Sequence, residues 1–119
     1  MLRNFKAYQL AKEHYWHCKE LKLPSLLKDQ LLRASSSVAL TLAEGSGKRT
    51  PADQRRFYAM AYGSFRECQA VVELEKVNDT NLNKLQDQLG AMLFTLSRKT
   101  ADRTETVTAA NAVAAAAAD

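Results

Sequence analysis

Four cations gather in one short stretch at the centre of the chain, and side chains of this type can bind phosphate. They are Lys48, Arg49, Arg55 and Arg56. The Thr50-Pro51 pair between them signals the start of a helix, where backbone N–H groups also favour anions. Asp53 falls in the same first turn, however, and a solvated charged loop commonly has this composition. The pattern leaves open both a phosphate-binding site and a simple solvated loop.

Two histidines and a cysteine could in principle bind a metal ion. His14 and Cys18 are four residues apart and share a helix face, with His17 beside them, and imidazole and thiolate are ligands that zinc prefers. Nothing else in the chain completes a recognised ligand motif, so we expect no metal and no other cofactor. Cys18 and Cys68 lack paired spacing, which predicts reduced thiols buried as small apolar side chains.

Nucleophilic catalysis finds little support in the sequence. Ser35, Ser36 and Ser37 lie inside an expected helix, without a strand-turn-helix elbow or a histidine and acid to activate a hydroxyl. The stretch AEGSGKRT contains a Gly-x-Gly-Lys sequence but lacks the spacing of a phosphate-binding loop of nucleotide hydrolases. We therefore expect a protein that is not an enzyme.

A row of polar residues accompanies the apolar stripe of the second expected helix, at the same helical spacing. Its members are Gln30, Arg33, Ser37, Thr41 and Glu44. An arginine beside a core needs a partner, and Glu67 on the next helix is the natural one for Arg33, with Glu44 and Arg56 as a second pair. These pairs are expected to be structural and to fix the helix register, although a binding site is the alternative interpretation.

The elements that position these residues follow from apolar residues recurring every three or four positions. The spacing predicts helices over about 3–22, 27–45, 51–76 and 82–99. Thr50 caps the third helix and Pro51 occupies its first position. Gly45 is expected to stop the second helix in a left-handed conformation. Gly63 falls in the middle of the third, where glycine costs roughly 1 kcal/mol against alanine unless a close approach of another backbone offsets the cost.

Short connections between four helices of similar length predict an all-α fold, an antiparallel up-down-up-down four-helix bundle over residues 1–100. Residues 101–119 form an Ala/Thr-rich C-terminal tail, which could extend the last helix or wander. The net charge of +4 permits contact with phosphates without requiring it. Neither a signal peptide nor an apolar run long enough to span a membrane is evident, so we expect a cytoplasmic protein.

The third expected helix also carries a second apolar row, roughly a quarter-turn from the first. The row consists of Tyr58, Tyr62, Phe65 and Val72. A monomeric bundle would expose much aromatic surface if this row faced solvent. The row therefore predicts either a contact between subunits of a homo-oligomer or a wider core.

Two consecutive segments, QLLRASSSVALTLAEGSGKRT and PADQRRFYAMAYGSFRE, resemble a known family. It is the family of bacterial four-helix-bundle proteins first met in intervening sequences of large-subunit ribosomal RNA genes. The residues that carry the resemblance are Gln30, Arg33, Ala34, Ser37, Val38, Ala43, Glu44, Gly45, Arg56, Phe57, Gly63, Ser64 and Glu67. Thr41 stands where the family often has asparagine, so no role is assigned to that side chain.

The resemblance implies a left-handed antiparallel bundle that assembles into a ring, expected to be a pentamer, with no established catalytic activity. More distantly, it points to the accessory variability protein of diversity-generating retroelements, a nucleic-acid-binding ring that is similar in fold. In a ring each basic loop would be repeated, and many weak phosphate contacts add in affinity. RNA or DNA is therefore the expected partner. The alternatives are a protein-interaction scaffold without nucleic acid and a metal-dependent enzyme housed in the bundle.

Overall fold

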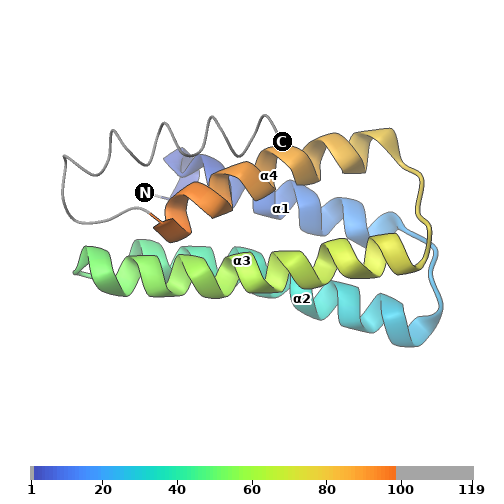
Figure 1. Ribbon diagram of the computed structural model, residues 1–119, viewed down its shortest axis with the longest axis horizontal. Coiled ribbons are helices and arrows are strands. Elements are labelled where there is room, and N and C mark those ends of the chain that lie inside the picture. The colour runs from blue at the N-terminus through green and yellow to red at the C-terminus, as the bar shows by residue number, and fades with distance from the viewer. Residues whose placement is uncertain (1, 99–119) are drawn as a thin grey trace.

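A computed structural model describes residues 2–98, and within them every regular element is helical. A short 3-10 helix, η1 (Leu2–Asn4), precedes α1 (Lys6–Glu20), α2 (Ser25–Ser46), α3 (Pro51–Leu74) and α4 (Thr80–Arg98). Successive helices run in opposite directions (Figure 1). The predicted antiparallel four-helix bundle is thus confirmed. The predicted tail, residues 101–119, lies outside the described residues.

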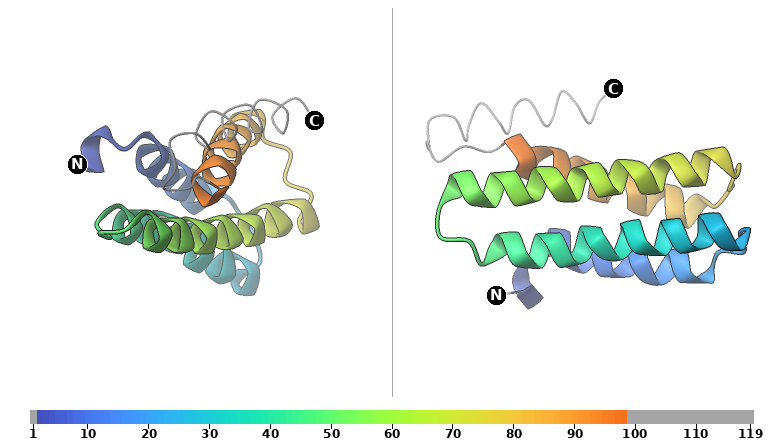
Figure 2. Two further views of the ribbon diagram at one scale, coloured as in Figure 1. Left: turned by 60° about the vertical axis from the view of Figure 1, so that its left-hand side comes forward. Right: turned by 90° about the horizontal axis from the view of Figure 1, so that it is seen from below.

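The four helices are arranged as the corners of a square in cross-section. α1 packs against α2 and α4, and α3 packs against the same two helices, with the most extensive contact between α2 and α3. In Figure 2, α2 and α3 run side by side along most of their length. Within residues 2–98 no comparably extensive contact joins α1 to α3. These two helices therefore occupy opposite corners of the bundle.

Helix α3 begins as the sequence predicts. Thr50 is extended, its hydroxyl oxygen accepts a hydrogen bond from the backbone N–H of Asp53 at 3.1 Å, and Pro51 is the first helical residue. This arrangement satisfies one of the donors that a helix start leaves unpaired. The helix ends slightly earlier than expected, at Leu74, and Lys76 then adopts a left-handed conformation with φ 53°.

The second apolar row of α3 lies mostly inside the bundle. Phe65, Val72 and Tyr58 are only 1%, 6% and 8% exposed. Tyr62 is half-buried, stacked on Phe65 and edge-on to Phe94. The row is buried because α3 sits between two neighbours, so that one side of it faces α2 and the other faces α4. The expectation of a subunit contact at Tyr58, Phe65 and Val72 therefore has to be revised in favour of the wider core.

Gly45 does not have the role that the sequence predicts, and within residues 2–98 Gly63 has no close neighbour. Gly45 does not end α2 in a left-handed conformation, because α2 continues to Ser46 and no described glycine has a positive φ. A Cβ atom at Gly45 would lie 2.9 Å from both Phe57 Cβ and Tyr58 Cε1. Gly63 has nothing within 4 Å of its Cβ position among the described residues, so no close approach there offsets the cost of glycine in the helix. The close approach between α2 and α3 is at Gly45.

Replacing Gly45 with alanine should destabilise the bundle. The added methyl group forces α2 and α3 apart, and overpacking of this kind typically costs about 1–3 kcal/mol, offset by the roughly 1 kcal/mol that alanine gains in a helix. We expect a net loss of about 1 kcal/mol or more in the free energy of unfolding, measured by urea denaturation. Gly47→Ala is the matched control, because its Cβ would meet only Glu44 O at 3.6 Å. An equal effect of both substitutions would contradict the close approach at Gly45.

Candidate nucleic-acid interface

The four predicted phosphate-binding cations lie at one end of the bundle, around the turn between α2 and α3. Lys48 and Arg49 are in the turn itself, and Arg55 and Arg56 are in the first turns of α3. This turn is at the left of Figure 1, opposite the loops that join α1 to α2 and α3 to α4. The fold therefore brings the four side chains to a single end of the molecule, the basic end.

Two of these cations lie over the aromatic ring of Phe57. The Lys48 Nζ atom lies 4.6 Å from the centre of the Phe57 ring, and the Arg56 guanidinium carbon lies 5.2 Å from it. A cation over an aromatic face is attracted by the negative charge density of the ring. One ring thus holds a cation from the turn beside a cation from the helix, although the two are eight positions apart in sequence.

Two carboxylates lie near the same cations but do not form the predicted pair. Glu44 Oε2 is 3.9 Å from Lys48 Nζ, and Asp53 Oδ1 is 3.8 Å from Arg56 Nη2. Each acid is thus close to a cation three or four positions away, which a helical turn places within reach. The expected contact between Glu44 and Arg56 is replaced by these two. Both contacts are long and solvent-exposed, and the four cations outnumber the two acids, so the end stays positive.

The N-terminus of α3 has few free backbone N–H groups that could bind an anion. The N–H of Asp53 donates to the Thr50 side chain, and the N–H of Gln54 donates to the Thr50 carbonyl at 3.0 Å. Pro51 has no N–H. Since most donors of this helix start are absent or already paired, any bound phosphate must be held by the cationic side chains.

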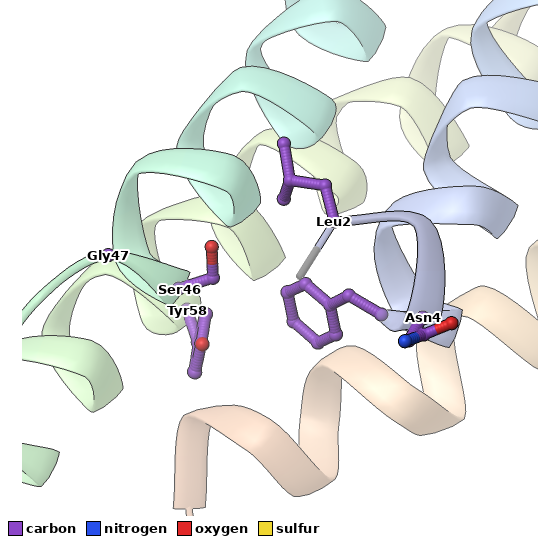
Figure 3. Close-up of a pocket in the computed structure, with 6 residues that line it drawn as sticks. Leu2, Asn4, Ser46, Gly47 and Tyr58 are labelled. Atoms are coloured by element: carbon purple, nitrogen blue, oxygen red, sulfur yellow. The ribbon is translucent and has the colours of Figure 1, made fainter.

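A shallow pocket of about 390 Å³ opens beside the basic end (Figure 3). Its lining comes from the N-terminal segment, the end of α2 and helix α3: Leu2, Asn4, Phe5, Ser46, Gly47 and Tyr58. The rings of Phe5 and Tyr58 are tilted against each other with their centres 5.9 Å apart, and burial raises the pKa of the Tyr58 hydroxyl. Nothing in the sequence pattern indicates this pocket, because only the folded chain brings the N-terminal segment to the end of α2.

The Arg33–Glu67 pair is present, but on the surface. Arg33 Nη2 lies 2.9 Å from Glu67 Oε2, which also accepts a hydrogen bond from Gln30 at 3.3 Å. The arginine side chain is 69% exposed, so it does not need a partner to offset burial. Exposed pairs of this kind contribute at most about 1 kcal/mol. The pair joins α2 to α3, as the structural interpretation requires, without being buried as expected.

The three candidate metal ligands of α1 do not all contact one another. His14 and Cys18 are buried, with His14 Nε2 3.7 Å from the Cys18 sulfur and 3.0 Å from the Gln86 side-chain nitrogen. His17 instead bonds to Asp79 at 2.8 Å, beyond the end of α3. Among residues 2–98 no three side chains of metal-binding type are grouped to hold an ion.

Burial governs the protonation of the His14 region. It lowers the pKa of His14 to about 4, with His17 adding repulsion, and it raises the pKa of the Cys18 thiol to about 12. Both groups are therefore neutral near pH 7. The Nδ1 atom of His14 is buried without a hydrogen-bond partner among the described residues, so protonation would place an uncompensated charge in the core.

The fold and its basic end define a small antiparallel helical-bundle protein with cations concentrated at one end. The sequence matches the family described as 23S rRNA-intervening sequence protein over residues 4–101. Since this match spans most of the chain, the protein belongs to that family, and the resemblance seen in the sequence is confirmed. Neither a curated protein nor a solved structure matches the chain. In the described residues, no helix is long and apolar enough to cross a membrane.

Acid should destabilise the fold through His14. The unfolded chain binds a proton at this residue below about pH 6.5 and the folded chain only below about pH 4, so the free energy of unfolding falls as the pH drops through this window. The gap between the two pKa values corresponds to roughly 3 kcal/mol. We expect urea denaturation between pH 7 and pH 4.5 to show a smaller loss for His14→Gln than for the wild type. Identical pH profiles would contradict a buried neutral His14.

Proposed function

We propose that the protein is a non-enzymatic, cytoplasmic homo-oligomer, a ring expected to be a pentamer, that presents repeated basic ends to RNA or DNA. The observation that carries the proposal is the grouping of Lys48 and Arg56 around Phe57 at one end of the bundle. This arrangement holds two cations beside one aromatic ring, on a surface where positive charge is in excess. Membership of the 23S rRNA-intervening sequence protein family is consistent with such a role.

The proposed affinity for nucleic acid requires several copies of the basic end. A single end offers only a few phosphate contacts, and each is weak and sensitive to salt. When several ends are joined in one ring, the later contacts become intramolecular and their contributions add. The proposal therefore couples the assembly to the binding: polyanion affinity depends on the number of copies.

A protein-interaction scaffold without nucleic acid is the alternative. It is favoured by the large apolar side chains that the bundle leaves exposed, among them Trp16, Leu40 and Met60. Exposed apolar groups on a small protein often mark contacts with other proteins. The two functions differ in one measurable property, because only the first predicts RNA or DNA binding that weakens steeply with salt.

Removing cations from the basic end should weaken RNA binding and reduce its salt dependence. For Lys48→Gln/Arg49→Gln we expect an affinity at least roughly tenfold lower at low salt, with a log–log salt slope shallower by about 0.7 for each phosphate that the variant no longer neutralises. The measurement is fluorescence anisotropy of a labelled single-stranded RNA over a KCl series. The control, Lys22→Gln/Lys84→Gln, removes the same charge from the opposite end. Equal weakening in both variants would refute a localised site, and no binding by the wild type would favour the scaffold.

The ring is tested by the mass of the protein in solution. Light scattering at micromolar concentration should give a mass about five times that of the 13.3 kDa chain. Nucleic acid absorbs at 260 nm, so the same chromatogram reports whether RNA or DNA remains bound to the protein as purified. A monomer would contradict the ring and the additive binding that follows from it.

A further inference from the structure

The shallow pocket beside the basic end has walls that the fold holds in place. On one side, the backbone N–H of Phe5 and the side-chain amide of Gln9 both donate to the Leu2 carbonyl at 3.0 Å, so the N-terminal segment is tied to α1. On the other side, Tyr58 is 8% exposed and packs on the α2 backbone at Gly45. The volume of about 390 Å³ is in the range of small-molecule sites. The pocket is thus formed before any ligand binds.

The lining of this pocket suits a flat ring with polar edges. Phe5 and Tyr58 contribute two aromatic rings, inclined at 53° to each other. Figure 3 shows Asn4 and Tyr58 on opposite sides of the hollow. The Asn4 amide is exposed, and the Tyr58 hydroxyl forms no hydrogen bond within residues 2–98. Both groups can donate and accept. A nucleobase has the matching features, since it stacks on aromatic side chains and forms hydrogen bonds at its edges.

The charges around the pocket favour a ligand that also carries phosphate. Arg3 and Lys6 belong to its N-terminal wall, and Arg49 lies in the turn that follows its α2 wall. All three are exposed, and in the described part of the chain none of them forms an ion pair or lies over an aromatic ring. The two acids of this end, Glu44 and Asp53, lie 3.9 and 3.8 Å from cations of the basic end. The charges left without a partner here are therefore positive.

We infer that the pocket takes an unpaired nucleobase of a single-stranded nucleic acid, while the neighbouring phosphates contact the cations around it. The inference rests on the proposed binding of nucleic acid and names what the basic end recognises besides phosphate. A base inside a duplex is stacked and paired, so only a base of a single strand can enter. Because a base contact releases no counterion, it adds affinity without making the salt dependence steeper.

The first test needs no variant. Fluorescence anisotropy compares the wild-type protein's affinity for a labelled single-stranded oligothymidylate with that for a strand of equal length whose sugars carry no bases. The two strands have the same number of phosphates. We expect the strand with bases to bind at least about fivefold more tightly, with the same log–log salt slope over a KCl series. Equal affinities would overturn the inference and leave the proposed phosphate binding in place, whereas no binding of either strand would remove the proposed function itself.

Two substitutions then locate the base contact. Ser46→Phe fills the pocket from its rim, and Phe5→Leu removes one ring while keeping an apolar side chain in the wall. In each variant the affinity for the strand with bases should fall toward that for the base-free strand, by about fivefold for Ser46→Phe, while base-free binding stays unchanged. Ser36→Phe is the matched control, because both serine hydroxyls donate to the carbonyl three residues earlier on α2 and Ser36 does not line the pocket.

Light scattering and heat denaturation verify that each variant keeps the wild-type mass and fold. If Ser46→Phe and Phe5→Leu still prefer the strand with bases as strongly as the wild type does, the bases bind another surface and the inference is overturned. An equal loss for both strands would contradict it as well, because the substitutions would then have disturbed the phosphate contacts alone. A preference that is lost in both pocket variants and kept in Ser36→Phe supports the assignment.

Discussion

The close approach of α2 and α3 at Gly45 is the constraint on which the rest of the structure depends. Because this residue has no side chain, Phe57 and Tyr58 pack directly on the α2 backbone, and the two helices form the most extensive contact in the bundle. The turn between them is consequently short, and Thr50 can cap α3 immediately after it. The same packing places Phe57 where cations from the turn and from the helix reach its ring.

Burial of two apolar rows on α3 has a second consequence, on the outside of the molecule. With Tyr58, Phe65 and Val72 directed into the core, the opposite side of α3 carries a mixture of exposed residues around Gly63, among them Met60 and Arg66. Such a mixture of exposed charged and apolar residues is ordinary for the outer side of a helix at the surface of a bundle.

The proposed function depends on charge and assembly more than on a shaped cavity. The basic end has few of the free backbone donors that make some helix starts into anion sites, so its long cationic side chains must supply most of the attraction. Such contacts are individually weak. The proposed ring would compensate by repeating them, so the proposed affinity for nucleic acid depends on the number of copies.

The sequence alone determined the elements: the helical spacing, the Thr50-Pro51 start of α3 and the cluster of cations are local features, and they fix the helices and the family. Only the tertiary structure decided what each helix side faces. Gly45 and Gly63 look alike in sequence, yet one lies against two aromatic rings and the other against nothing. The partners of Glu44 and Arg56, the position of Tyr58 and the pocket near Phe5 likewise depend on how helices rotate and meet. Helical periodicity specifies which side of a helix is apolar. Which neighbouring helix covers each part of that side is decided by the packing of the whole bundle.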